Sequence, residues 1–242
     1  MLKLEHIDWN SPDGKPVLKD LELTVPDGKL VVITGPNGSG KTTLARIIAG
    51  IEKPSAGRIY LDGEDITGLD VTERARRGVS FAFQQPVRFK GITVRQLIDT
   101  AAGGEQDEAR LCDILSKVGL CARDYIDREV NATLSGGEIK RIEIATVIAR
   151  HTRLSLFDEP EAGIDLWSFK NLIGVFNDMH KDLTGTLMII SHQERILRIA
   201  DEIILLAGGS IQASGAREQM LPVLQGKSAA VGCCRGEAAC NE

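Results

Sequence analysis

The chain has 242 residues, of which 43% are hydrophobic, and this is enough for one sizeable domain with a buried core. Its net charge of −5 argues against a general nucleic-acid-binding surface. The sequence has no run of about 18 apolar residues and no apolar signal core at its start, so we expect a cytoplasmic protein without direct membrane insertion.

The predicted elements alternate between strands and helices along most of the chain. Strands, recognised from alternating or continuously apolar patterns, are expected at residues 2–8, 17–25, 30–33, 58–61, 79–83, 154–157, 187–190 and 202–206. Helices are expected at about 41–49, 165–182, 192–200 and, with breaks, over most of 93–150. Strands that alternate with helices at both ends of the chain predict an α/β fold with a mostly parallel sheet, interrupted by an inserted helical lobe.

These patterns also predict the division of the chain. We expect one domain over residues 1–225, with a helical subdomain at about 86–150 inserted in it. The remaining segment, 226–242, is small and polar, which predicts a flexible tail.

The five cysteines do not suggest a secreted disulfide framework, because their number is odd and three lie near the end of the chain. These three are Cys233, Cys234 and Cys240. Adjacent cysteines lack the two-residue separation of common zinc and cluster motifs, so a reduced, exposed tail is preferred to a metal site. Cys112 and Cys121, in the helical middle, are interpreted as small packing residues.

A complete Walker A phosphate-binding motif lies between a predicted buried strand and a predicted helix. Its residues are Gly35, Pro36, Asn37, Gly38, Ser39, Gly40, Lys41 and Thr42. Glycines at this spacing let backbone N–H groups surround phosphates, and the start of the helix adds the positive end of its dipole. We expect Lys41 to reach the β- and γ-phosphates, the Thr42 hydroxyl to bind Mg²⁺, and Thr43 to contact the α-phosphate side. A chance glycine-rich turn is disfavoured by the flanking elements.

Two adjacent acids follow the apolar strand predicted at 154–157. Asp158 and Glu159 would lie at the carboxyl end of this strand, where ligands bind in open α/β sheets. Asp158 is the candidate Walker B carboxylate that holds Mg²⁺, directly or through water. Glu159 is the candidate group that polarises the attacking water. The pair alone would be a weak signal, but downstream of a Walker A motif it is strong.

A glycine-containing segment upstream of Asp158 resembles the signature sequence of the ABC (ATP-binding cassette) ATPases. It consists of Leu134, Ser135, Gly136, Gly137 and Glu138. A helix start capped by Ser135, with Glu138 completing a capping box, is the structural interpretation. Both interpretations can hold together, because a cap and an anion site use the same N–H groups.

The resemblance implies a nucleotide-binding domain with a mostly parallel P-loop sheet, an antiparallel β subdomain and an inserted helical subdomain. It implies ATP and Mg²⁺ as cofactors and hydrolysis of ATP as the activity. It also implies that the signature contacts ATP held by a second subunit. Two copies of the chain would then form a head-to-tail homodimer that encloses two ATP molecules.

Three more motifs match the family in its usual order. Gln84 resembles the Q-loop glutamine, which senses Mg²⁺ and the attacking water, and it is preferred to its neighbour Gln85. Asp165 matches the acid of the D-loop, although the residues before it depart from the common form. His192 resembles the switch histidine that contacts the γ-phosphate. The resemblance thus gives as catalytic candidates Glu159, His192 and Gln84, and as Mg²⁺ candidates Thr42, Gln84 and Asp158.

Within the family, several stretches resemble SufC, the ATPase of the SUF iron–sulfur cluster assembly system. They are the signature continuation 138–141, the Q-loop continuation 85–91 and the opening 13–19. This resemblance implies a SufB/SufD-like scaffold protein as partner, whose shape changes with ATP binding and hydrolysis. Partner contact is expected on the helical lobe and the Q-loop, near Arg88, Phe89 and Lys90.

The alternative is a nucleotide-binding subunit of an ABC membrane transporter. The interval between Gln84 and Ser135 is shorter than expected for SufC and normal for an importer subunit. The absence of a membrane segment is common to both hypotheses and decides nothing. The SufC-like interpretation is preferred from the sequence, and the transporter remains open.

Overall fold

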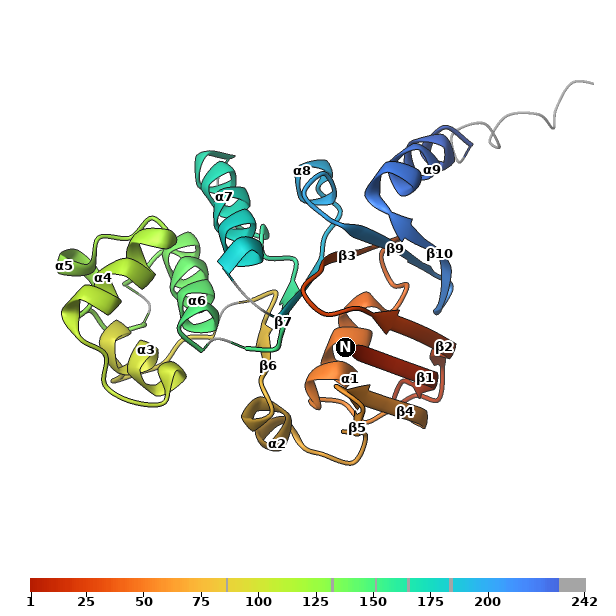
Figure 1. Ribbon diagram of the computed structural model, residues 1–242, viewed down its shortest axis with the longest axis horizontal. Coiled ribbons are helices and arrows are strands. Elements are labelled where there is room, and N and C mark those ends of the chain that lie inside the picture. Colours follow the sequence, from red (N-terminus) through yellow and green to blue (C-terminus); the bar gives the residue numbers. More distant parts are fainter. Residues whose placement is uncertain (86, 132, 151, 165, 183–184, 231–242) are drawn as a thin grey trace, which may run out of the picture.

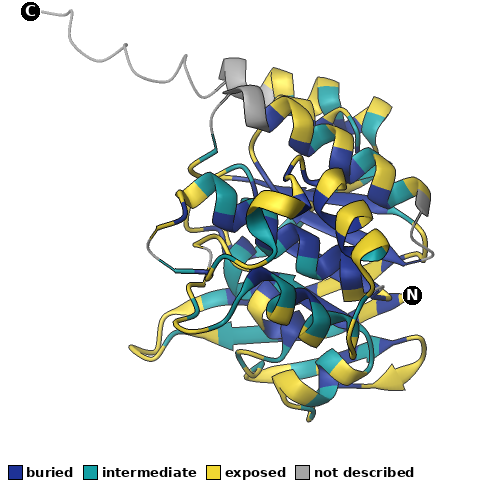
Figure 2. Cartoon of the chain, turned by 90° about the vertical axis from the view of Figure 1, so that its left-hand side faces the viewer, coloured by how far each residue is buried: buried dark blue, intermediate teal, exposed yellow. Residues whose placement is uncertain are grey.

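The computed structural model describes residues 1–85, 87–131, 133–150, 152–164, 166–182 and 185–230, without the side chains of 166–168, 182 and 227–230. The described residues form two β-sheets; the larger runs through the middle of the molecule with helices beside it, and the smaller lies at one side, next to α1 (Figure 1). In Figure 2 the strands in the middle of the molecule and the inner faces of the helices are buried, whereas the strands at its lower edge and the outer faces of the helices are partly exposed.

The smaller sheet is antiparallel and has the strand order β2-β1-β4-β5. Its strands are β1 (Leu2–Asn10), β2 (Pro16–Val25), β4 (Ala56–Leu61) and β5 (Glu64–Asp65). Along the second half of β2, buried side chains alternate with exposed ones, and this period of two produces a sheet with one apolar face.

The larger sheet has the order β10-β9-β3-β8-β7-β6, and every neighbouring pair is parallel except β10 and β9. Its strands are β3 (Leu30–Thr34), β6 (Val79–Ala82), β7 (Leu154–Asp158), β8 (Thr186–Ile190), β9 (Glu202–Ala207) and β10 (Ser210–Ala216). Every residue of β3, β7 and β8 is buried, because both faces of the sheet are covered.

The two faces of this sheet belong to two separate cores. On β3, Val31 and Ile33 pack in a core shared with the antiparallel sheet. Leu30 and Val32, which point the other way, pack in a core shared with the helices that follow β6 and β7. The continuous apolar run of β3 therefore supplies both cores at once.

Among the residues described between β6 and β7, four helices form the inserted segment, and they gather at one end of the molecule (Figure 1). They are α3 (Val94–Ala102), α4 (Glu108–Lys117), α5 (Ala122–Tyr125) and α6 (Gly136–Arg150). The remaining helices are α1 (Lys41–Ala49), α2 (Val71–Arg76), α7 (Leu166–Asp182), α8 (Glu194–Leu197) and α9 (Arg217–Ala230).

A buried arginine ties α2 to the end of α1. Arg74 is 1% exposed, and its guanidinium donates hydrogen bonds to the main-chain oxygens of Ile47, Ile48 and Thr67. Two of these oxygens, those of Ile47 and Ile48, lie in the last turn of α1, where the helix itself offers fewer N–H partners; Ile47 also accepts from Gly50 N–H. Arg74 lies outside the predicted nucleotide site, so its contacts are structural.

The predicted fold class is confirmed, but some details were wrong. The sequence patterns missed β5, β10, α2 and α9. Helix α9 continues to Ala230, so it extends into the segment predicted to be a tail from residue 226. The predicted exposure of Cys233, Cys234 and Cys240 concerns residues outside the described part of the chain.

The packing role predicted for two other cysteines was also wrong, since Cys112 and Cys121 are both exposed. Cys112 lies on α4, whose buried positions Leu111, Ile114 and Leu115 face the core, and Cys121 precedes the first turn of α5. Among the residues described, no helix has both the length and the apolar character needed to cross a membrane.

Candidate functional site

The loop between β3 and α1 requires glycine at defined positions. Gly35 has φ +142°, and a Cβ there would lie 1.9 Å from the main-chain oxygen of Leu206. Gly40, which precedes α1, has φ +99°, a left-handed conformation that favours glycine. Helix α1 begins at Lys41, where the sequence predicts it, so its free N–H groups face the loop.

Lys41 folds back onto this loop. Its side chain is buried, and Nζ donates hydrogen bonds to the main-chain oxygens of Gly35 and Pro36, each at 2.9 Å. Burial lowers the pKa of Lys41, and the nearby carboxylates of Glu159 and Asp158 partly oppose this effect. The loop thus holds a buried cation beside the free N–H groups at the start of α1, a setting suited to phosphate oxygens.

Ser39 gives a second indication that the loop fits an anionic ligand. Its hydroxyl oxygen is buried and has no hydrogen-bond partner among the residues that the structure describes. Buried polar groups are normally paired. Phosphate oxygens in the loop would provide a partner, so the residues present fit a bound nucleotide.

Thr42 and Asp158 meet across the space between α1 and β7. Thr42 Oγ1 donates to Asp158 Oδ1 at 3.1 Å, and Asp158 is 2% exposed. Burial raises the pKa of Asp158, and the hydrogen bond from Thr42 partly opposes the rise. A hydroxyl and a buried carboxylate are oxygen ligands of the kind that Mg²⁺ uses together with phosphate oxygens and water. The two side chains therefore fit a magnesium site.

Glu159 lies at the junction of three strand ends. Its N–H donates to the Ile190 oxygen of β8 at 3.0 Å, and its φ of 44° is left-handed, which is uncommon for a residue with a long side chain. Gln84, just beyond β6, donates from Nε2 to Glu159 Oε2 at 2.6 Å. His192, just beyond β8, has Nε2 at 3.8 Å from Glu159 Oε1. Strained backbone of this kind concentrates at functional sites.

The protonation of His192 follows from the same surroundings. Partial burial lowers the pKa of His192, and the Lys41 charge lowers it further, while Glu159 opposes both. A histidine whose pKa is below its usual value is neutral at pH 7. Its ring can then either accept or donate a hydrogen bond near the phosphate loop.

The signature segment starts α6 with the predicted capping box. Ser135 N–H donates to Glu138 Oε2 at 2.7 Å, and Glu138 N–H donates to Ser135 Oγ at 3.3 Å. Tyr125 donates its hydroxyl to Glu138, and this bond, with those from Ser135, lowers the pKa of Glu138 to about 2. These partners belong to the inserted helical segment. A Cβ at Gly136 or Gly137 would meet nothing within 4 Å, so this helix start is open.

The structure thus brings together six of the predicted site residues and leaves others apart. Lys41, Thr42 and Asp158 lie around the loop, and Gln84, Glu159 and His192 form the adjoining group. Gln84, not Gln85, contacts Glu159, but it does not contact the other two predicted Mg²⁺ ligands in the described structure. Asp165 lies outside the described residues.

Sequence reasoning missed one polar pair beside this group. Lys140 is 1% exposed, and its Nζ is 3.0 Å from Glu143 Oε2. Both lie on α6 and bond to the main chain of Phe83. The signal available in the sequence was a lysine and a glutamate three positions apart within a largely apolar helix.

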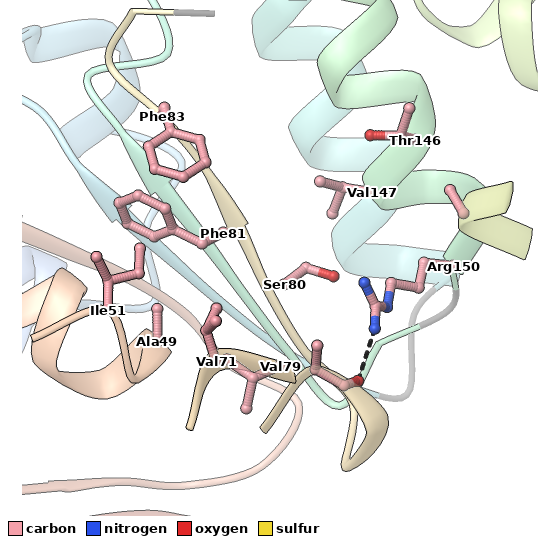
Figure 3. A pocket seen from close by; sticks show the side chains of 12 residues that line it. Ala49, Ile51, Val71, Val79, Ser80, Phe81, Phe83, Thr146, Val147 and Arg150 are labelled. Atoms are coloured by element: carbon pink, nitrogen blue, oxygen red, sulfur yellow. Dashed lines mark hydrogen bonds between the residues drawn. The ribbon is translucent and has the colours of Figure 1, made fainter. Parts of the chain in front are cut away.

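An apolar hollow lies between the edge strand β6 and helix α6, and Phe83, the residue before Gln84, lines it (Figure 3). It has a volume of about 200 Å³, and Phe81 and Phe83 face Thr146 and Val147 across it. A second hollow of about 150 Å³ shares Phe81, Phe83 and Thr146 and extends to Val87. Together these hollows form a groove, and Phe83 and Val87 are 37% and 44% exposed in it.

The loop, the acids and the strand ends around them define a P-loop nucleotide hydrolase, with the ligand edge at the carboxyl ends of the parallel strands. The model of the ABC transporter family matches residues 18–162, so the chain belongs to the ABC family of ATPases. It binds ATP with Mg²⁺ and hydrolyses it.

Known proteins resemble the chain over most of its length. It is 41% identical to an uncharacterized ABC transporter ATP-binding protein of Methanocaldococcus jannaschii, over 84% of both chains. It is 36% identical to the sulfate/thiosulfate import ATP-binding protein CysA of Synechocystis sp., over 84% of this chain but only 57% of that relative's length. A solved dimeric ATP-binding cassette, bound to ADP and Pi after hydrolysis, matches with a TM-score of 0.80 and 25% identity, over 90% of this chain and 99% of that one.

Proposed function

We propose that the chain is the nucleotide-binding subunit of an ABC membrane transporter and works at the cytoplasmic face of the membrane. The observation that carries this proposal is the 36% identity to an import ATP-binding protein over 84% of the chain. The subunit would bind ATP, close against a second copy, and pass the resulting movement to a membrane-spanning partner.

In this proposal the site residues divide the work of hydrolysis. Lys41 and the loop N–H groups bind the phosphates, with Thr43 on the α-phosphate side. Thr42, Asp158 and Gln84 would hold Mg²⁺, which would supply positive charge to offset the charge on the phosphate oxygens. Glu159 would accept a proton from the attacking water.

His192 would complete this arrangement. Its neutral ring lies near both Lys41 and Glu159, so it can hydrogen-bond the γ-phosphate without adding a charge. Gln84 would orient the attacking water through its contact with Glu159. The 2.6 Å hydrogen bond between them supports this role, because it already places the amide beside the carboxylate.

We also propose that the signature residues act on the ATP of a second subunit in a head-to-tail homodimer. The open helix start at Gly136 and Gly137 supports this, since its N–H groups have room for a phosphate from outside the chain. Glu138 itself contacts Tyr125 and Arg128, which belong to the same inserted helical segment. The solved cassette that resembles the chain is dimeric.

The apolar groove that Phe83 lines is the proposed contact with the membrane-spanning subunit. It exposes Phe83 and Val87, and it lies between β6 and the inserted helices, so an occupant would touch both parts of the chain. Arg88, Phe89 and Lys90 follow along the same loop, where the sequence predicts partner contact. An apolar helix end from a partner would suit such a surface.

The second candidate function is the SufC-like one, with a SufB/SufD-like scaffold as partner. The stretches 138–141 and 85–91 favour it. None of the relatives described above carries a cluster-assembly name, whereas their names do refer to transport. The transporter proposal therefore takes precedence.

The two candidates are separated by the partner that the chain captures. We expect the tagged chain to recover a polytopic membrane protein from a detergent-solubilised extract, and little from a detergent-free extract. Mass spectrometry identifies the partner, and reconstitution with it should raise ATPase activity. Val87→Asp, in the groove, should abolish this capture, whereas Val223→Asp, on α9 and 40% exposed, should leave it intact. Recovery of a scaffold of the SufB/SufD type, with no polytopic protein, would refute the transporter proposal.

The dimer proposal has its own test in Ser135→Arg. The bulky cation should block the ATP-dependent dimer by obstructing the open helix start, while the isolated chain still binds ATP within about threefold of its original affinity. Loss of the cap should lower stability by about 1 kcal/mol. Light scattering with ATP, in a Glu159→Gln background in which hydrolysis is expected to be slow, measures the dimer. Ser116→Arg, at an exposed position of α4, is the matched control and should still dimerise. Loss of ATP binding by the Ser135→Arg monomer would show that the signature belongs to the chain's own site.

A further inference from the structure

We propose that buried Lys140 and half-buried Glu143 together hold the main chain at Phe83 and thereby position Gln84 for ATP hydrolysis. The two residues touch neither nucleotide nor water in this proposal, so they are positioning residues. The inference deepens the proposed function, because it rests on the role assigned there to Gln84.

The contacts form a clamp on a single residue of the main chain. Lys140 Nζ donates to the Phe83 oxygen, and Glu143 Oε1 accepts from the Phe83 N–H at 2.8 Å. The two side chains also contact each other, with Lys140 Nζ 3.0 Å from Glu143 Oε2. Both main-chain groups of Phe83 are therefore held from helix α6.

The two side chains bond the main chain just beyond the last paired residue of β6. The last paired residue of β6 is Ala82, which lies opposite Phe157 of β7. Phe83 comes next, beyond the ladder, and Gln84 follows with its amide on Glu159. Without these two bonds, the main chain would leave the sheet with the N–H and C=O groups of Phe83 unpaired among the described residues, just before Gln84.

A charged pair that is largely removed from water, with side chains 1% and 15% exposed, is a poor means of stabilising a helix against a sheet. Two apolar side chains of similar volume would fill the same space without the desolvation that two ions require. Burial raises the pKa of Glu143, and the Lys140 charge and the Phe83 bond oppose that rise. Apolar side chains could not bond the Phe83 N–H and C=O, so the observed pair is suited to fixing a main-chain position.

The same helix carries the signature at its first turn. Lys140 lies about one turn beyond Gly136, where α6 begins. A rigid helix that holds Phe83 therefore links the start of α6 to the residue before Gln84. Movement of α6 would be transmitted to Gln84 through two side chains.

The test replaces the pair together, as Lys140→Met/Glu143→Leu, so that no single buried charge is left behind. In steady-state assays of the full chain we expect kcat to fall roughly 10- to 100-fold, as for a misplaced reacting group, and KM for ATP to change less than about threefold. In a Gln84→Ala background the same replacement should lower kcat no further, because residues that act through one another are not additive. Lys140→Met alone, in which Glu143 still holds the Phe83 N–H, should give an intermediate loss and keeps the test available if the pair variant fails to fold.

Arg74→Lys provides the structural control. It perturbs a fully buried cation that bonds main-chain oxygens elsewhere, so it should lower the melting temperature yet keep kcat of the folded protein within about threefold. Unchanged kcat in a folded pair variant, or an equal further loss in the Gln84→Ala background, would overturn the clamp. If Gln84→Ala itself kept the original kcat, the role assigned to Gln84 would fail, and the clamp with it. The partner captured by the chain tests the transporter proposal independently of all these rates.

Discussion

Glu159→Gln is expected to reduce ATP hydrolysis about 10²- to 10⁴-fold, the usual effect of removing a general base. The amide keeps the shape of the side chain, and its oxygen can still accept the hydrogen bond that Gln84 now donates to Glu159 at 2.6 Å. It cannot accept a proton from water, so kcat should fall while the Kd for ATP stays within about threefold. The variant should accumulate as an ATP-bound dimer, because hydrolysis normally reopens it.

Single-turnover hydrolysis and size-exclusion chromatography with ATP measure these two effects. Glu161→Gln is the matched control, since it makes the same change two positions away, where the carboxylate instead accepts from Ser191. The control should hydrolyse ATP within about threefold of the original rate. Near-normal turnover by Glu159→Gln would refute the role proposed for Glu159.

The second large effect is expected from Lys41→Ala, which should weaken ATP binding on the order of 10²- to 10³-fold. Its charge lies in the loop and bonds the main-chain oxygens of Gly35 and Pro36, from where it can reach phosphate oxygens. Loss of one buried, hydrogen-bonded charge from a binding site commonly weakens affinity to this degree. The melting temperature of the nucleotide-free protein should change little. The reason is that burial lowers the pKa of Lys41, so the fold disfavours the charged form of this side chain and does not depend on it for stability.

Calorimetric titration and thermal unfolding with and without ATP separate binding from stability. ATP should raise the melting temperature of the original chain, because it binds only the folded state. The same ATP concentration should have almost no effect on Lys41→Ala. Lys53→Ala, which removes an exposed charge after α1, should bind ATP normally. Binding by Lys41→Ala within about threefold of normal would contradict the proposed phosphate contact.

Several features of the candidate site could be predicted because they are local. The Walker A glycines, the start of α1 at Lys41 and the capping box of Ser135 with Glu138 depend on backbone conformations and hydrogen bonds within a few residues. Apolar runs identified β3, β7 and β8 for a similar reason, since a strand buried on both faces has apolar side chains at most positions.

Other predictions failed because the features concerned depend on residues that are close in space but distant in the sequence. Cys112 was assigned to the interior from residue type alone, but the position of α4 on the core exposes it. Strand β10 alternates only weakly, and its pairing with β9 defines it. The buried state of Lys140 contradicts the usual exposure of lysine, and only its contacts with Phe83 and Glu143 explain it.

The sequence by itself indicated the family and located the phosphate loop and the two candidate acids, because phosphate binding uses a short motif whose spacing is dictated by backbone geometry. Only the tertiary structure decided which side chains meet. Gln84 and Glu159 are 75 positions apart, and they touch because β6 and β7 are neighbours in the sheet and end at the same edge. Strand order and helix placement depend on how apolar faces pack together, and no short stretch of residues contains that information.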